Sequence, residues 1–128
     1  MFYEALYPEL GKLFYYVASV DGKVRGAERE SLQKIIQNSW KPLENSVDKY
    51  GTDLANLIDF SFDYEESEHV TKNGMESFEA FFNDNKLSFT PVIISNILQT
   101  VKTIAEAYHG KNKGEEKVLK RLNELFQK

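Results

Sequence analysis

The sequence contains no cysteine, which excludes disulfide bonds and thiolate metal sites. No stretch approaches the roughly 18 consecutive apolar residues that a membrane-spanning helix needs. The first residues, Met-Phe-Tyr-Glu, lack the basic and apolar segments of a signal peptide. We therefore expect a cytoplasmic protein that does not insert directly into a membrane.

The motifs of common catalytic centres are also missing. The chain has no cysteine nucleophile, no Gly-x-Ser-x-Gly, no phosphate-binding glycine-rich loop and no His-Glu-x-x-His zinc motif. Neither histidine lies in a context that favours a Ser-His-Asp triad. None of these catalytic templates is therefore recognisable in the sequence.

The composition is that of a single globular domain spanning residues 1–128, with 41% hydrophobic and 13% aromatic residues. The net charge of −4 argues against non-specific binding to nucleic acid. Acidic residues predominate between positions 59 and 84, and basic residues predominate after position 110. Two oppositely charged solvated faces would account for this pattern. The alternative is a dipolar surface that docks a charged protein partner.

Apolar residues recur at three- and four-residue steps along most of the chain, which is typical of amphipathic helices. We expect helices over about residues 3–17, 26–40, 43–49, 52–64, 71–82, 90–108 and 115–126. Pro8 indicates either that the first helix begins there or that it kinks. Apolar and polar residues also alternate over residues 58–64, as they would in a strand, but no second strand is evident to pair with it. The predicted fold is all-α, one compact domain of six to seven helices.

The two ends of the chain contain similar helix–turn–helix segments. Residues 18–32 include Ala18, the turn Asp21-Gly22-Lys23 and then Glu28, followed by an amphipathic run. Residues 105–119 include Ala105, a turn at His109-Gly110-Lys111 and then Glu115-Glu116. This near-repeat predicts two pseudo-twofold halves, each a helix, a short turn and a second helix.

Asp21 and Glu28 are the first candidate ligands in these segments. A carboxylate at the end of one helix and another in the first turn of the next could converge on a hard cation such as Ca²⁺ or Mg²⁺. The loop is too short for an EF-hand and lacks its alternating ligands. Both residues also have a purely structural explanation, because Asp-Gly is common in turns and acids near a helix N-terminus offset its dipole.

The pattern Ala18-x-x-Asp21-Gly22-Lys23-Val24-x-x-x-Glu28-x-x-x-Leu32 resembles the signature of the TerB-like family. That family includes tellurite-resistance TerB proteins and the N-terminal domain of a membrane-anchored DnaJ-like co-chaperone. The resemblance implies about seven helices, an acidic pocket for a divalent metal, and a role in stress-related protein complexes rather than catalysis.

Carried over by position, the resemblance assigns Asp21 and Glu28 to the first half of the metal site and Glu115 or Glu116 to the second half. Gly22 and Gly110 are the motif turns. This sequence has Tyr108-His109 where family members usually have Asp before the glycine. Oxygen ligands favour Ca²⁺ or Mg²⁺ over iron, whereas His109 would suit a transition metal.

A different class of function is suggested by two Glu-x-x-His motifs, Glu66–His69 and Glu106–His109. Two such motifs form half of a ferritin-like di-iron site, which would make the protein a di-metal oxidoreductase. The predicted positions argue against this alternative, because His109 lies at a helix end and Glu66–His69 in an acidic segment. A third possibility is a self-association module that binds no ligand.

Overall fold

Six α-helices account for most of the residues that the structure describes, so the predicted all-α fold class is confirmed. This computed structural model describes residues 2–19, 26–43, 47, 50–68, 73–106 and 113–127. Within these ranges, residues 26–28 and 113–115 are described by their backbone alone. The helices are α1 (Phe2–Ala18), α2 (Gly26–Ile35), α3 (Asn56–Glu68), α4 (Gly74–Asp84), α5 (Pro91–Glu106) and α6 (Lys113–Phe126). None of them is long and apolar enough to cross a membrane.

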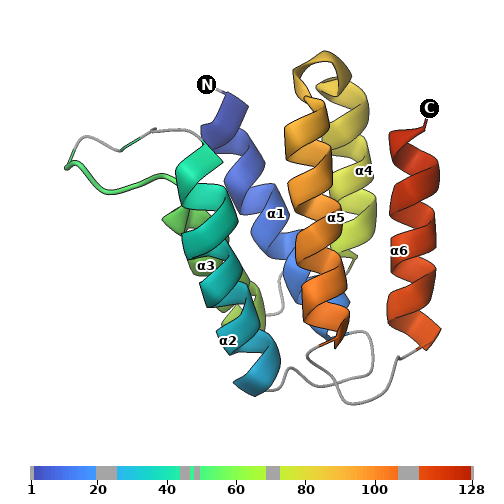
Figure 1. The fold of residues 1–128 in the computed structure, drawn as a ribbon, viewed down its shortest axis with the longest axis horizontal. Helices are drawn as coiled ribbons and strands as arrows, with labels where there is room; N and C mark the ends of the chain where they lie inside the picture. The colour runs from blue at the N-terminus through green and yellow to red at the C-terminus, as the bar shows by residue number, and fades with distance from the viewer. Residues whose placement is uncertain are drawn as a thin grey trace.

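Helix α1 is the central element of the bundle. It packs against α3, α4 and α5, and Figure 1 shows it running between the α2–α3 side and the α4–α5–α6 side. Six of its large apolar side chains are completely buried: Leu6, Tyr7, Leu10, Leu13, Phe14 and Val17. The buried stripe predicted from the sequence therefore faces the core, and Tyr7 adds to it.

Pro8 lies inside α1, which begins at Phe2. The alternative that the helix starts at Pro8 is therefore wrong. A proline disfavours a helical conformation in the turn before it. That turn is nevertheless helical here, because Leu6 and Tyr7 are both fully buried and their packing stabilises the helical backbone. The Pro8 carbonyl also accepts a hydrogen bond from the Ser61 hydroxyl of α3, at 2.7 Å.

The chain leaves α2 through a π-helical turn, Ile36–Trp40, and a short 3₁₀ turn, Lys41–Leu43. The helix expected over 43–49 is wrong at Val47, because this residue forms an isolated antiparallel bridge with Asp53. The Asp53 side chain then accepts a hydrogen bond from the Ala55 N–H at 2.9 Å, and α3 begins only at Asn56. The helix start predicted at Thr52 is therefore too early.

Two other helices begin at side-chain caps. The Asn73 side chain accepts hydrogen bonds from the Met75 and Glu76 N–H groups, both at 3.1 Å, and so caps α4. Thr90 caps α5 by accepting from the Ile93 N–H at 3.2 Å, and proline occupies the first position of that helix. Helix α3 confirms the helical interpretation of residues 58–64.

Two glycines allow other helices to approach α1 closely. A β-carbon on Gly11 would lie 2.5 Å from the Ser61 Cβ and 2.6 Å from the Ile58 carbonyl oxygen of α3. A β-carbon on Gly74 of α4 would lie 2.5 Å from the Lys12 carbonyl oxygen. These separations are shorter than van der Waals contact, so only glycine fits at either crossing without displacing a helix.

We expect Gly11→Ala to lower the free energy of unfolding by about 1–3 kcal/mol, because the added methyl group overpacks the crossing of α1 and α3. Ala80→Gly is the matched control, since Ala80 is exposed on α4 and reports helix propensity alone, with a loss of about 1 kcal/mol. Urea unfolding measures the free energy of unfolding of both variants. A Gly11→Ala variant as stable as the unchanged protein would contradict the close crossing.

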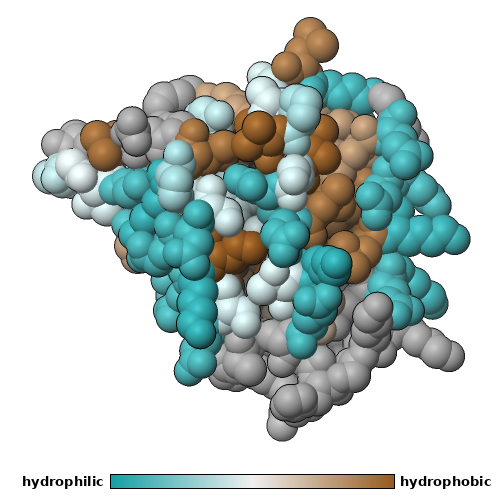
Figure 2. Space-filling model, in the orientation of Figure 1, coloured by the Kyte–Doolittle hydropathy of each residue, from teal (hydrophilic) through white to brown (hydrophobic). Residues whose placement is uncertain are grey.

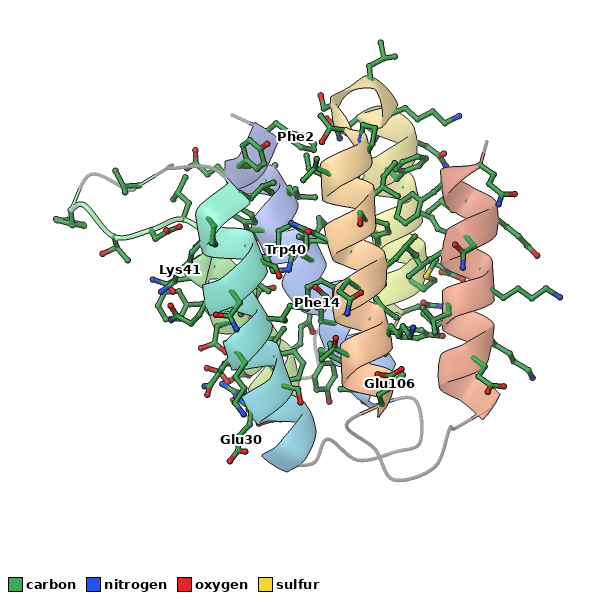
Figure 3. The ribbon with its side chains drawn as sticks, in the orientation of Figure 1. Phe2, Phe14, Glu30, Trp40, Lys41 and Glu106 are labelled. Carbon is green, nitrogen blue, oxygen red and sulfur yellow. The ribbon has the colours of Figure 1, made fainter. Side chains whose placement is uncertain are left out.

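Trp40 connects the π-helical turn to α5 through a buried hydrogen bond. Its indole Nε1–H donates to the Thr100 hydroxyl at 3.0 Å, and that hydroxyl donates to the Asn96 carbonyl at 2.7 Å. Neither Trp40 nor Thr100 is exposed to solvent. Figure 3 shows the Trp40 side chain lying between this turn and α5. The Asn96 amide also donates to the Ser39 carbonyl at 3.2 Å, so two bonds join these elements.

Replacing Thr100 with Val keeps the shape of the side chain but leaves the Trp40 N–H buried without its acceptor. We expect this variant to lose about 1–3 kcal/mol of stability in urea unfolding. The matched control is Thr103→Val, because the Thr103 hydroxyl bonds the Gln99 carbonyl in the same way but at an exposed position. If the two variants lost the same free energy of unfolding, the hydrogen bond from Trp40 would contribute nothing to stability.

Candidate functional site

The turns of both predicted half-sites fall outside the described residues. Asp21, Gly22, His109 and Gly110 are in this group, so the structure does not locate their side chains. Glu28 lies in the first turn of α2 and Glu115 in the first turn of α6, and only their backbone is described. Glu116, also in the first turn of α6, is exposed. The assignment of these residues to a cation site stays a prediction.

The helices that carry the two motifs meet at one end of the bundle. Figure 1 shows that α1 ends, α2 begins, α5 ends and α6 begins at the same end, whereas α1 begins and α6 ends at the opposite one. The connections over 20–25 and 107–112 therefore join helix ends that share one side of the molecule. Within the described part of the chain, no three His, Cys, Asp or Glu side chains are arranged to hold a metal ion.

The glutamates of the two Glu-x-x-His motifs lie on different helices. Glu66 is exposed in the last turn of α3, and Glu106 is exposed as the last residue of α5 (Figure 3). His69 and His109 are outside the described residues. Di-iron ligands project into the core of a bundle. The described positions of the two glutamates therefore give the di-metal alternative no support.

Arg29 of α2 forms the densest charged cluster in the described residues. Its guanidinium forms ion pairs with three α3 carboxylates: Asp59 at 3.4 Å, Asp63, and Glu66 at 3.8 Å. The same group lies over the Phe62 ring, 5.3 Å from its centroid, in a cation–π contact. One cation thus joins α2 to the acidic face of α3. We call Arg29, Asp59, Asp63 and Glu66 the Arg29 cluster.

Burial, and to a smaller extent the excess of carboxylates in this cluster, shifts the pKa values of Asp59 and Tyr15. Burial raises the pKa of Asp59, Arg29 opposes that rise, and the Asp63 carboxylate adds to it. Burial also raises the pKa of the Tyr15 hydroxyl, and the charges of Glu66 and Glu65 raise it further. The Tyr15 ring packs edge-on against Phe62, with 5.6 Å between centroids.

The sequence contains one signal for this cluster. Asp59, Asp63 and Glu66 are spaced four and three residues apart, which places them along one face of a helix. Their partner could not be inferred, because Arg29 is 30 residues before Asp59 and belongs to a different helix.

The surface has two grooves, one beside the Arg29 cluster and one between α5 and α6. A polar groove of about 420 Å³ lies beside the cluster, lined by Glu30, Gln33, Lys34, Ile36, Gln37, Asn56 and Asp59. A second groove of about 650 Å³ lies between α5 and α6, with Pro91, Ile94, Leu98 and Leu119 among its lining residues. Figure 2 shows hydrophobic surface between the polar rims of these two helices.

Comparison with protein-family models, curated proteins and solved structures found no match to this chain. The likeness to TerB-like proteins therefore rests on the motif residues at the two ends of the chain.

The raised pKa of Asp59 predicts a specific dependence of stability on pH. The pKa of this carboxyl is higher in the folded state than its unfolded value of about 3.9, so the folded state holds the proton more tightly. The free energy of unfolding therefore falls as the pH rises from the unfolded pKa to the folded pKa. We expect Asp59→Asn to be more stable than the unchanged protein at pH 7. The advantage should shrink as the pH approaches 4. Urea unfolding across this range measures it.

Glu124→Gln is the control for this experiment, because it removes a carboxylate from an exposed position on α6. An Asp59→Asn variant that is less stable than the unchanged protein at pH 7 would show that the ion pair with Arg29 outweighs the cost of burying the carboxylate.

Proposed function

We propose that this protein is a non-catalytic TerB-like domain that binds other proteins and holds a divalent cation at one end of its helical bundle. One observation carries the proposal. The helix ends that flank the two motif halves share one end of the molecule, as a site built from both halves requires (Figure 1). The all-α fold agrees with the architecture that the resemblance implies.

The residues proposed for the cation come from both halves of the chain. Asp21, from the connection between α1 and α2, and Glu28, from the first turn of α2, supply carboxylates. His109, from the connection between α5 and α6, and Glu115 and Glu116, from the first turn of α6, supply the other ligands. Oxygen ligands of this kind suit Ca²⁺ or Mg²⁺, and the imidazole of His109 would extend the range to transition metals. A bound cation would also offset the repulsion between carboxylates gathered at one place.

The proposed cellular role is assembly with protein partners in a stress response in the cytoplasm. The absence of catalytic motifs and of cysteine supports this role, as does the separation of acidic and basic segments along the chain. A charge-separated surface favours docking of a partner with complementary charge. The proposed partner is a protein, not a nucleic acid.

Thermal unfolding of chelator-stripped protein with Ca²⁺, Mg²⁺, Mn²⁺, Zn²⁺ or Fe²⁺ tests the cation site. An ion that binds only the folded state, at about 100 times its dissociation constant, stabilises it by about 2.7 kcal/mol, which raises the unfolding temperature by several degrees. We expect such a shift with Ca²⁺ or Mg²⁺. Asp21→Asn should abolish it without changing the helix content measured by circular dichroism.

Asp84→Asn is the matched control, because Asp84 is an exposed aspartate at the end of α4. It should leave the ion-dependent shift intact. A shift confined to Mn²⁺, Zn²⁺ or Fe²⁺ would assign the site to His109 and a transition metal. A shift that survives Asp21→Asn would show that Asp21 is not a ligand, and no shift with any ion would contradict the cation site.

A further inference from the structure

Helix α3 has two large aromatic side chains on its outer side. Phe60 is 60% exposed and Tyr64 is 58% exposed. They are one helical turn apart, and at about 100° per residue they point away from the buried Ile58 and Phe62. Most aromatic side chains in the described residues are buried or partly buried, so this exposed pair is unusual for the molecule.

Carboxylates border this pair on both sides. Asp63 lies on the flank that leads to the Arg29 cluster, and the exposed Glu68 lies on the opposite flank, as the same helical geometry requires. The Asp63 side chain is 46% exposed even though it pairs with Arg29. We define Phe60, Asp63, Tyr64 and Glu68 as the outer face of α3.

The charge of α3 is strongly one-sided. The helix contains five acidic residues and no lysine or arginine. Among the described ion pairs, those that reach α3 all come from Arg29, so negative charge remains in excess. Like charges at spacings of three and four residues destabilise a helix, and acids in its last turn oppose its dipole. A positively charged partner would remove both costs.

The molecule already contains the contact that such a partner would make. Arg29 lies over the Phe62 ring while its guanidinium reaches the neighbouring carboxylates. The outer face of α3 has the same two components, aromatic rings and flanking carboxylates, but they face solvent. Arginine suits this combination better than lysine, because its planar guanidinium stacks on a ring and still donates hydrogen bonds at its edge.

We propose that the outer face of α3 is a docking surface for a basic, arginine-containing protein segment. One or two guanidinium groups stack on Phe60 and Tyr64 and form ion pairs with Asp63 and Glu68. This inference rests on the proposed role as a protein-binding domain and names the chemistry of the partner. It uses no residue of the proposed cation site, so the two proposals can fail separately.

Titration of the 128-residue chain with capped octa-arginine, octa-lysine and octa-glutamate peptides, followed by two-dimensional amide NMR, tests this proposal. We expect octa-arginine to perturb amides of residues 56–68, octa-lysine to bind more weakly, and octa-glutamate not to bind. The Phe60→Ala/Tyr64→Ala double variant should weaken octa-arginine binding about 5- to 30-fold and reduce the preference for arginine over lysine.

The matched control is Leu87→Ala/Val92→Ala, which removes two exposed apolar side chains near the turn between α4 and α5. It should leave octa-arginine binding unchanged. Asp63→Asn/Glu68→Gln should lower both the affinity and its dependence on salt. Asp84→Asn/Glu124→Gln is the control for charge, because both carboxylates are exposed, on α4 and α6, and neither belongs to the proposed cation site.

Three results would overturn the proposal: perturbations spread evenly over the surface, equal losses in the aromatic and control variants, or self-association through α3 without peptide binding. The ion-dependent unfolding assay on the same variants separates the two hypotheses. An intact cation shift without peptide binding would contradict this inference alone. Peptide binding at α3 without any ion-dependent shift would contradict the cation site alone.

Discussion

The passage of α1 between α3 and α4 is the constraint on which the rest of the fold depends. Gly11 lets α3 approach one side of α1, and Gly74 lets α1 approach the start of α4. Because both approaches involve the backbone of the central helix, the neighbouring helices are fixed at short distance from it. The core residues of α1 then contact several helices at once, and α5 closes the bundle through the hydrogen bond between Trp40 and Thr100. Few positions could change here without moving a whole helix.

The parts of the fold that could be predicted from the sequence are those governed by local rules. Helix α5 follows from Thr90-Pro91 and a wide apolar face, and α4 from the capping side chain of Asn73. The start of α3 could not be predicted, because it depends on the pairing of Asp53 with Val47, and β-bridges have no helical periodicity. The Arg29 cluster was missed for a related reason, since its cation comes from a different helix. Asp21 and His109 lie outside the described residues, so the predicted cation site is supported only by the helices around it.

The charges of this protein have two different structural contexts. In the Arg29 cluster three carboxylates share one guanidinium, which connects α2 to α3, and burial raises the pKa of Asp59. On the outer face of α3, Glu68 and the solvent-facing side of Asp63, which belongs to both groups, border exposed rings. The first arrangement stabilises the position of a helix, whereas the second resembles the centre of a binding surface, where aromatic and charged groups occur together. One acidic helix can therefore serve the fold on one side and recognition on the other.

The central position of α1 has a consequence for how the protein is made. A ribosome synthesises this helix before its partners α3, α4 and α5, at about 5–20 residues per second. Until α3 and α4 have left the exit tunnel, the apolar stripe that includes Leu10 and Phe14 lacks most of the surface that buries it in the finished fold. The nascent chain thus exposes the apolar side of an amphipathic helix until its main partners have been synthesised.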